Sequence, residues 1–403
     1  MRILIINLLY PPAKFGGAEK AASLLAEAFA KHGDEVFVIS LHPGCDEKVE
    51  QRNGVQIYSL PLDNIYWPLD SAKKQGRAAT FFWHVIDIWN NKAAKRVGRI
   101  LDEVKPDVVH THVITGLSVS IWKEIKKRRI RLVHTLHDYY LICARSSLFR
   151  NGDNCARPCI ECRALTAVPK LLSRKVDTVV SVSNHVIKTH RKYGRFKGVS
   201  GKVIYNIENS ITGNHSNYRD TIKESASGGR LIFGYIGRIS PEKGVETLLH
   251  ATTYIKNPAW QLKIAGGGND DYVAELRRKF SDPRIEWLGF MLSREFYSSV
   301  DVIVIPSVWQ DPLPYVAIES FAAGKSVICA ESGGLPELAS LGKMIETYPA
   351  MDARALSETM EKAILNQSAW CDGGFANSEA KAAFSEDAVV NQYRAVYSQA
   401  NRP

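Results

Sequence analysis

Four charged side chains in the second half of the sequence have types and spacings that suit a ligand with phosphates and hydroxyls. Arg238 and Lys243 stand five residues apart in FGYIGRISPEKGVETLL, on a turn that we expect to join a strand to a helix. Two cations so placed could both bind a diphosphate. Asp311 follows another apolar run, and Glu319 comes eight residues later. Carboxylates at this spacing could accept paired hydrogen bonds from vicinal hydroxyls, one on a sugar and the other on a ribose.

Two glycines near the amino terminus could bind the same diphosphate. Gly16 and Gly17 follow a first apolar run and precede an amphipathic segment. Bare N–H groups at the start of a helix can bind a phosphate that a β-carbon would obstruct. Glycines in such a turn often serve only close packing, and the GxGxxG dinucleotide pattern is absent. Both explanations stay open.

Four of the seven cysteines lie in one segment, 137–165. Cys143, Cys155, Cys159 and Cys162 have the spacing C-x11-C-x3-C-x2-C. This spacing is compatible with a tetrahedral zinc site that would stabilise a loop with little core of its own. Only the C-x2-C and C-x3-C parts have the usual metal spacing. Structural zinc, unligated thiols and an oxidised pair therefore remain as alternatives.

Short β-branched runs alternate with amphipathic segments, which predicts parallel sheets covered by helices. The alternation pauses in a polar stretch rich in turn formers and then restarts. We therefore expect an α/β fold with two doubly wound, Rossmann-like domains that face each other across a cleft, with ligands at the carboxyl ends of the strands. The predicted divisions are a first domain at 1–205, a linker at 206–229, a second domain at 230–383, and a helix at about 384–400 that packs back on the first domain.

Length and composition agree with this organisation. A chain of 403 residues exceeds one ordinary hydrophobic core, and 45% hydrophobic with 23% charged residues is typical of a globular protein. No apolar run reaches the roughly 18 to 20 residues needed to cross a bilayer, and the opening MRILIINLLYPP resembles a first strand more than a signal peptide. Together with the odd cysteine count, this predicts a cytoplasmic protein.

The formal charge of +10 predicts an anionic partner. The segment 122–132 holds six Lys or Arg against one Glu, and 185–202 holds six and no acid. Neither has the interleaved aromatic residues of a single-strand nucleic-acid groove, so we expect no nucleic acid as partner. A solvated basic face and a membrane-surface patch are the remaining alternatives.

These motifs resemble those of the retaining glycosyltransferases of family 4, in the GT-B fold class. The resemblance is carried by PPAKFGGAEK and DVVHTH in the first half, and by GRISPEKGVETLL, IAGGG and PSVWQDPLPYVAIESFAAGKSVICAESGGLPE in the second. The family's Glu-x7-Glu motif reads Asp311-x7-Glu319 here, and its Asn-Gly before the linker reads Asn206-Ile207. The resemblance implies transfer of a sugar from a UDP- or GDP-sugar to a glycan or lipid-linked acceptor, with retention, in cell-surface polysaccharide or lipopolysaccharide biosynthesis.

The resemblance also implies roles for single residues. Arg238 and Lys243 would hold the donor diphosphate without a divalent metal or other cofactor, Glu319 would bind the ribose, and Asp311 the donor sugar. His112, at the end of DVVHTH, would lie beside donor sugar and acceptor, although a strand-end histidine bonded to backbone is the alternative. The implied catalytic set is His112, Arg238, Lys243, Asp311 and Glu319, and the implied donor-binding set is Gly16, Gly17, Arg238, Lys243, Asp311, Leu313, Pro314, Tyr315 and Glu319.

In this fold class the first domain binds the acceptor, and the basic residues cluster there. We therefore predict reversible docking of the segment 122–132 on an anionic membrane, which would place the protein peripherally at the inner face of the cell membrane. Two other functions remain open: a different GT-B enzyme such as an epimerase, and a non-catalytic sugar-nucleotide-binding protein.

Overall fold

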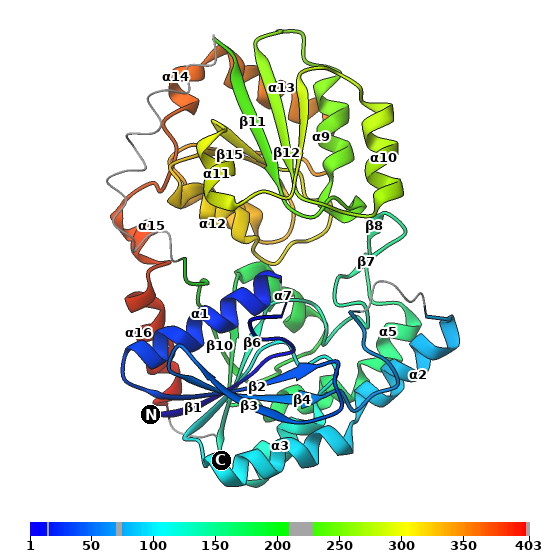
Figure 1. Cartoon of the computed structure of the whole chain (residues 1–403), viewed down its shortest axis with the longest axis vertical. Coiled ribbons are helices and arrows are strands. Elements are labelled where there is room, and N and C mark those ends of the chain that lie inside the picture. Colours follow the sequence, from blue (N-terminus) through cyan, green and yellow to red (C-terminus); the bar gives the residue numbers. More distant parts are fainter. Residues whose placement is uncertain (14–15, 70–74, 209–228, 400–403) are drawn as a thin grey trace. The chain divides into compact units, whose positions relative to one another are not determined.

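The computed structural model describes residues 1–13, 16–69, 75–208 and 229–399, which form two compact units (Figure 1). Unit 1 consists of Met1–Leu148, Cys155–Ile207 and Glu386–Pro403, and unit 2 of Phe149–Asn154 and Glu208–Ser385. Most of the predicted linker, residues 209–228, lies outside the described residues.

Unit 1 is built on an eight-stranded sheet with the order β10-β9-β6-β5-β1-β2-β4-β3 in the part of the chain that the structure describes. The strands are β1 (Arg2–Ile6), β2 (Glu35–His42), β3 (Lys48–Arg52), β4 (Val55–Pro61), β5 (Val108–Thr111), β6 (Arg131–Leu136), β9 (Thr178–Ser181) and β10 (Ser200–Val203). The named pairs are parallel except β3 with β4. The strand order reverses between β1 and β5, and ligands bind at such a reversal in open parallel sheets.

The helices of unit 1 cover this sheet. They are α1 (Gly17–Lys31), α2 (Arg77–Ile88), α3 (Asn91–Val104), α4 (Ser120–Lys127), α5 (Ile160–Leu165), α6 (Ala167–Leu172), the 3-10 turn η1 (Ser173–Lys175), α7 (Asn184–Lys192) and α16 (Glu386–Tyr397). The helix α2 ends at Ile88 because Asn90 caps a new helix, α3, its side chain accepting from Ala93 N at 3.1 Å.

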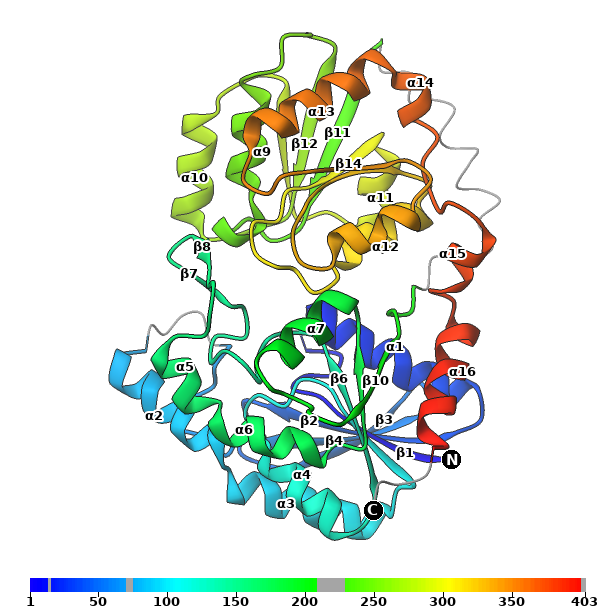
Figure 2. The same cartoon turned by 180° about the vertical axis from the view of Figure 1, so that it is seen from behind.

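The two ends of the chain meet in unit 1. Figures 1 and 2 show α16 beside α1, which the contacts between the two helices confirm. Phe29 of α1 packs against Tyr397 of α16 with ring centroids 5.4 Å apart. Both helices bury apolar side chains in the same core as β1 and β2, so α16 completes the fold of unit 1.

Unit 2 repeats the architecture with a six-stranded parallel sheet, in the order β13-β12-β11-β14-β15-β16 among the described residues. The strands are β11 (Leu231–Ile236), β12 (Trp260–Ala265), β13 (Ile285–Gly289), β14 (Val302–Ile305), β15 (Ser326–Ala330) and β16 (Ile345–Tyr348). The reversal here falls between β11 and β14. Both sheets thus confirm the predicted doubly wound, Rossmann-like α/β class.

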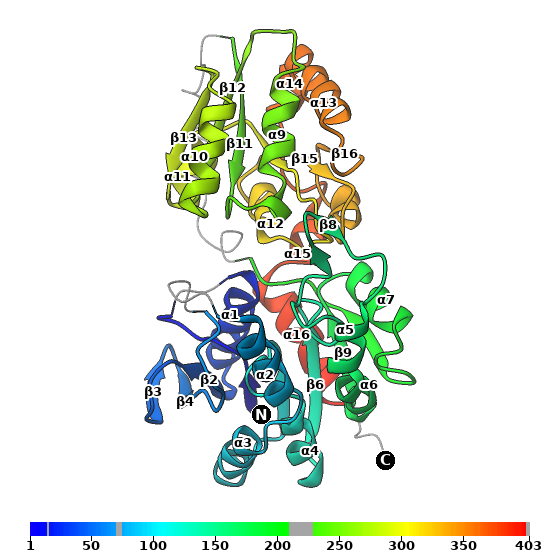
Figure 3. The ribbon, with the colours of Figure 1, turned by 90° about the vertical axis from the view of Figure 1, so that its right-hand side faces the viewer.

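The helices of unit 2 follow the strands in turn. They are η4 (Pro241–Lys243), α9 (Val245–Thr252), α10 (Asp270–Lys279), α11 (Ser293–Ser298), α12 (Tyr315–Ala322), η5 (Leu335–Ser340), α13 (Ala353–Leu365), α14 (Gln367–Trp370) and α15 (Ser378–Ala382). Figure 3 shows α9 next to α13, and the two helices are in contact. A two-stranded hairpin, β7 (Phe149–Arg150) and β8 (Asp153–Asn154), belongs to unit 2 although the sequence analysis assigned it to the first domain.

Over the described ranges, the structure contains no helix whose length and hydrophobicity would suffice to span a membrane.

Candidate functional site

The charged residues predicted in unit 2 gather at its sheet reversal. Arg238 and Lys243 follow β11, and Asp311 follows β14, the neighbouring strand. Lys243 Nζ lies 2.5 Å from Asp311 Oδ2, and the side chains are 24% and 6% exposed. Trp309 adds to the pair, because its Nε1 donates to Asp311 Oδ2 at 3.2 Å and Lys243 Nζ lies 5.1 Å from its ring centre. Lys243 and Asp311, which were predicted separately from the sequence, therefore form one ion pair in the site.

Two glycines allow the turn that carries Lys243 and the loop that carries Asp311 to pack closely against their neighbouring backbone. Gly244 has φ +73°, and a β-carbon there would lie 1.8 Å from the carbonyl oxygen of Pro306. Gly333 has φ +60°, and its β-carbon would lie 2.1 Å from the carbonyl oxygen of Asp311. Any other residue at either position would push apart the turn that carries Lys243 or the loop that carries Asp311.

Arg238 is accessible to a ligand. Its side chain is 67% exposed and pairs at 2.8 Å with Glu242, four residues later in the sequence. Tyr235 OH donates to the carbonyl oxygen of Arg238 at 2.7 Å, which fixes the backbone while the guanidinium remains in solvent. An exposed ion pair of this kind is weak and can exchange its carboxylate for a stronger anion.

Glu319 lies inside α12, as the spacing predicts, and accepts a hydrogen bond from Tyr297 OH at 3.0 Å. Burial, with the charge of Glu319, raises the pKa of Tyr297, so the phenol stays protonated and keeps donating. Tyr297 lies on α11, and no motif in the sequence pointed to it. Of the predicted donor-sugar residues, Pro314 is the N-cap of α12, whereas Leu313 and Tyr315 are buried beside it.

A side chain from the β7–β8 hairpin also contacts the Asp311 loop. Asn154 Nδ2 donates to the carbonyl oxygen of Val308 at 2.7 Å, and Asn154 Oδ1 accepts from Gln310 N at 3.2 Å. The two bonds hold the segment just before Asp311. Residues more than 150 positions apart in the sequence meet here, so sequence reasoning missed the contact.

In unit 1, His112 lies at the sheet reversal, directly after β5. Its backbone N donates to the carbonyl oxygen of Ile6 in β1 at 2.8 Å. Its Nδ1 lies 2.8 Å from His137 Nε2, and the two rings stack at 5.1 Å with 19° between their planes. His112 Nε2 is buried and has no partner among the described residues. His137 follows β6, and a histidine directly after a strand was the only signal that could have identified it.

These two rings belong to a cluster of histidines in unit 1, which we call the histidine cluster: His110, His112, His134 and His190 are buried, and His137 is half-buried. Burial lowers the pKa of all five, that of His137 to about 4. In the neutral pair one ring nitrogen donates and the other accepts, so the tautomers of His112 and His137 are coupled. His110 bonds Tyr397 OH at 2.6 Å and Thr135 Oγ1 at 2.7 Å, so both its nitrogens serve the core.

Two carboxyl groups with raised pKa values lie in the same unit, Asp87 buried and Asp138 half-buried. Burial raises the pKa of Asp87 and of Asp138 to about 7. Asp87 accepts from Tyr140 OH at 2.6 Å and from Gly116 N at 2.7 Å, and Asp138 accepts from Tyr140 N at 2.8 Å. The bonds favour the charged form of each carboxyl, but the cost of burying that charge is larger.

Gly16 is the N-cap of α1, and Gly17 is the first residue of the helix. Gly16 has an ordinary φ of −100°, and its N–H donates to Glu19 Oε2 at 3.0 Å. Among the described residues, an added β-carbon would meet only that flexible carboxylate, at 3.3 Å. Neither backbone geometry nor packing against the described residues requires a glycine here, so the close-packing explanation loses its support at Gly16.

Within segment 137–165, Cys162 contacts two of the other cysteines. Cys162 Sγ lies 3.7 Å from Cys143 Sγ, and Cys159 Sγ accepts from Cys162 N at 3.5 Å. Four thiolates around zinc at about 2.3 Å stand about 3.8 Å apart, so the first pair has a spacing that fits. The hydrogen bond from Cys162 lowers the pKa of Cys143 to about 6. Within the described ranges, however, no group of three or more ligating side chains converges on a metal position.

Comparison with known proteins identifies both units. Residues 15–207 match the family model Glycosyltransferase Family 4, and residues 217–382 match the model Glycosyl transferases group 1. An "uncharacterized 42.6 kDa protein in cps region" of Klebsiella pneumoniae is 35% identical over 341 residues, 85% of this chain and 88% of the relative. A glycosyltransferase of Methanocaldococcus jannaschii is 27% identical over 356 residues, 84% of this chain and 82% of that one.

Solved structures show the same fold. Sucrose-phosphate synthase from Thermosynechococcus elongatus aligns with a TM-score of 0.74 at 20% identity and covers 98% of both chains. HepE from Anabaena, solved with UDP and glucose, aligns with a TM-score of 0.70 at 18% identity and covers 99% of this chain and 100% of its own.

Proposed function

The chain belongs to the GT-B family of glycosyltransferases, and we propose that it is a retaining enzyme. It takes a UDP- or GDP-sugar and glycosylates a glycan or lipid-linked acceptor in cell-surface polysaccharide or lipopolysaccharide biosynthesis. The cps region named for the Klebsiella relative supports the pathway, and the UDP and UDP-glucose complexes of HepE support a nucleotide-sugar donor.

The observation that carries this proposal is the pairing of Lys243 with Asp311 next to the exposed Arg238, at the sheet reversal of unit 2. Asp311 holds the ammonium in place, and a donor diphosphate would bind both cations. As the bond between the sugar C1 and the phosphate oxygen breaks, the two cations stabilise the charge on the leaving group. Glu319, held by Tyr297, binds the ribose hydroxyls.

Retention follows from attack on the face that the phosphate leaves. The acceptor hydroxyl forms the new bond to C1, and its proton passes to the leaving phosphate oxygen, so the nucleoside diphosphate departs without a separate base. In unit 1, His112 Nε2 is the ring atom left for a substrate oxygen, since Nδ1 is bonded to His137. We propose that His137 acts as a positioning residue.

The test uses purified full-length chain and a panel of UDP- and GDP-sugars in excess EDTA. We expect release of the nucleoside diphosphate, with an α-linked product from an α-linked donor by NMR. Arg238→Ala should lower turnover at least ~10²-fold, the scale for one preorganised electrostatic contact. Arg278→Ala, an exposed arginine on α10 of the same unit, is the matched control and should keep its activity. Inversion at C1, strict dependence on added Mg²⁺, or equal losses in the two variants would contradict the proposal.

We further propose that unit 1 binds an anionic membrane surface, and the structure changes which residues support this. Of the six cations in 122–132, Lys126 is bound by Asp177, Arg128 is bound by Asp102 and Glu124, and Arg131 is buried. Half of the basic segment is therefore neutralised or enclosed within the fold, which leaves Lys123, Lys127 and Arg129 exposed.

The helix α2 supplies an apolar surface, and its C-cap residue Trp89 contacts one of these cations, Lys123. It lies at the outer side of unit 1 in Figures 1 and 2. Phe81, Phe82 and Val85 on its outer face are 48%, 59% and 41% exposed. Lys123 Nζ lies 5.5 Å from the ring centre of Trp89, the C-cap of α2. Exposed aromatic side chains flanked by cations are typical of helices that lie in a membrane interface.

Sedimentation with vesicles tests this placement. The chain should bind vesicles rich in phosphatidylglycerol, ignore phosphatidylcholine, and dissociate in high salt. Phe81→Ser with Phe82→Ser should release it while donor hydrolysis is unchanged. The control pair Phe290→Ser with Leu292→Ser removes apolar side chains that are even more exposed, from unit 2, and should still bind. A wild-type chain that stays in the supernatant at low salt would refute the membrane placement but not the transferase activity.

A further inference from the structure

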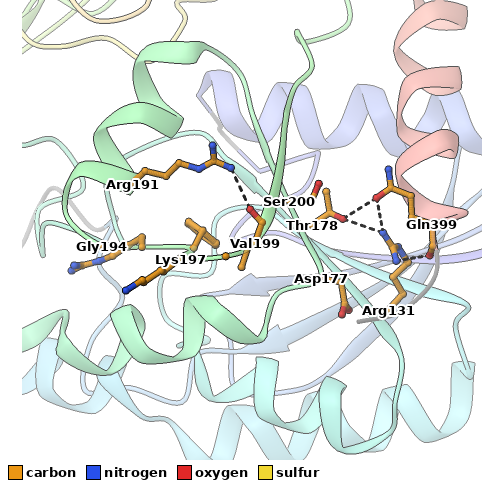
Figure 4. Close-up of a pocket in the computed structure, with 12 residues that line it drawn as sticks. Arg131, Asp177, Thr178, Arg191, Gly194, Lys197, Val199, Ser200 and Gln399 are labelled. Atoms are coloured by element: carbon orange, nitrogen blue, oxygen red, sulfur yellow. Dashed lines mark hydrogen bonds between the residues drawn. The ribbon is translucent and has the colours of Figure 1, made fainter. Parts of the chain in front are cut away.

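Unit 1 contains a pocket of about 850 Å³ at the end of the sheet opposite to His112 (Figure 4). Arg131, Thr178 and Ser200 line it, and they are the first residues of β6, β9 and β10. His112 follows the carboxyl end of β5, which runs parallel to β6. The pocket is therefore separate from the candidate site, and its volume lies in the range of small-molecule sites.

The lining of this pocket is strongly basic. It includes four cationic side chains and one acidic side chain, namely Arg131, Arg191, Arg195, Lys197 and Asp177. The carboxylate of Asp177 is already bound by Lys126, whose Nζ lies 2.8 and 2.9 Å from its two oxygens. The one acid in the lining thus does little to balance the cations.

Arg195 provides a fixed positive charge. It is 6% exposed, and among the described residues it donates to neutral oxygens, the carbonyls of Leu141 and Tyr193 and both oxygens of Thr166. Burial lowers its pKa only to about 10, so it stays charged at neutral pH. A buried guanidinium held by carbonyls raises the electrostatic potential around it, because few water molecules screen it.

Two further cations can contact a ligand directly. Arg191 on α7 and Lys197 in the following loop are both exposed. The Arg191 guanidinium donates to the carbonyl oxygen of Val199 at 3.2 Å, which orients it along the pocket wall in Figure 4. The hydroxyl of Ser200 is a neutral donor on the same lining, whereas Thr178 Oγ1 already accepts from Arg131 and donates to Gln399. A guanidinium, an ammonium and a hydroxyl donor together are the usual partners of phosphate oxygens.

We propose that this pocket binds a phosphate-bearing ligand, with Arg191 and Lys197 in direct contact with the phosphate. The site lies at the amino ends of the strands and takes no part in sugar transfer. The phosphate can belong to a soluble metabolite or to a lipid headgroup, since both present the same oxygens to these cations.

Titration calorimetry with inorganic pyrophosphate tests the site in the full-length chain. An Arg238→Ala background weakens the diphosphate site of unit 2, so that the remaining binding reports on unit 1. In that background, Arg191→Ala with Lys197→Ala should weaken pyrophosphate binding at least tenfold, the scale of one lost charge-assisted contact. Lys188→Ala with Lys192→Ala removes the same charge from exposed positions of α7 and should leave the affinity within twofold.

Vesicles of phosphatidylglycerol and of phosphatidylcholine form the second arm. Pyrophosphate binding that depends on Arg191 and Lys197 identifies a soluble ligand. Vesicle binding that depends on the same pair, without pyrophosphate binding, identifies a headgroup. The proposal is overturned if neither probe binds, or if the control pair weakens binding as much as Arg191 and Lys197 do. Donor hydrolysis should be unchanged in both double variants carrying native Arg238.

Discussion

Replacing Lys243 by methionine should affect stability and activity by separable amounts. Asp311 is 6% exposed, so removing the ammonium leaves a nearly buried carboxylate whose remaining side-chain partner in the site is Trp309. Removing one partner of a buried ion pair lowers the free energy of unfolding by about 3 to 5 kcal/mol, whereas an exposed ion pair contributes about 0 to 1 kcal/mol. Lys243 is about one quarter exposed. We therefore expect Lys243→Met to lower the free energy of unfolding by about 2 kcal/mol.

The double variant Lys243→Met with Asp311→Asn removes both charges. An asparagine oxygen can still accept from Trp309 Nε1, so most of the lost stability should return. Donor hydrolysis should stay at least ~10²-fold lower in the single and the double variant, because neither can bind the diphosphate at this position. This contrast separates the structural role of the ion pair from its role in catalysis.

Differential scanning calorimetry measures the first effect and nucleotide release the second. A loss of 2 kcal/mol corresponds to a fall in Tm of about 4 to 8 °C for a domain of this size. Lys279→Met is the control, because Lys279 pairs with Glu246 at 2.7 Å while both side chains are nearly half exposed. It should shift Tm by no more than about 2 °C. A double variant no more stable than Lys243→Met, or a single variant with normal hydrolysis, would refute the reasoning.

Three further predictions concern unit 1. Gly16→Ala should leave Tm within about 2 °C of the wild type, because the β-carbon meets only a flexible carboxylate. It should lower donor hydrolysis at least tenfold, and unchanged hydrolysis would show that Gly16 does not contact the donor. If Cys143, Cys155, Cys159 and Cys162 bind zinc, metal analysis of reduced protein without a His tag should find about one zinc per chain, and Cys159→Ser with Cys162→Ser should abolish it and lower Tm; metal-free wild-type protein would end the zinc hypothesis. Between pH 6.5 and 5 the five histidines of the cluster take up protons in the unfolded chain but stay neutral in the folded protein. Asp87 and Asp138 behave in the opposite way, because their raised pKa values let them take up protons in the folded state. Five histidines that favour the unfolded state outweigh two carboxyls that favour the folded state, so the free energy of unfolding should fall by up to about 4 kcal/mol for each pH unit of acidification. A Tm at pH 5.5 equal to or above that at pH 7 would contradict these pKa directions.

The sequence by itself determined the class of fold and the location of the charged motifs. Strands and helices alternate at short range, and a turn between a strand and the next helix is a local feature. Arg238 and Lys243 could therefore be placed on one turn, and Glu319 inside a helix, without knowledge of any distant contact. The doubly wound class followed from the same alternation, because parallel strands need crossover helices between them.

The tertiary structure decided which of these residues meet within each unit. Lys243 and Asp311 are 68 positions apart and pair because β11 and β14 are neighbours in the sheet. His137 reaches His112 for the same reason, across β5 and β6. The basic segment 122–132 shows the opposite effect, because acids supplied by other elements neutralise part of it. A side chain's charge can be read from the sequence, but its partner depends on strand order and packing between distant segments.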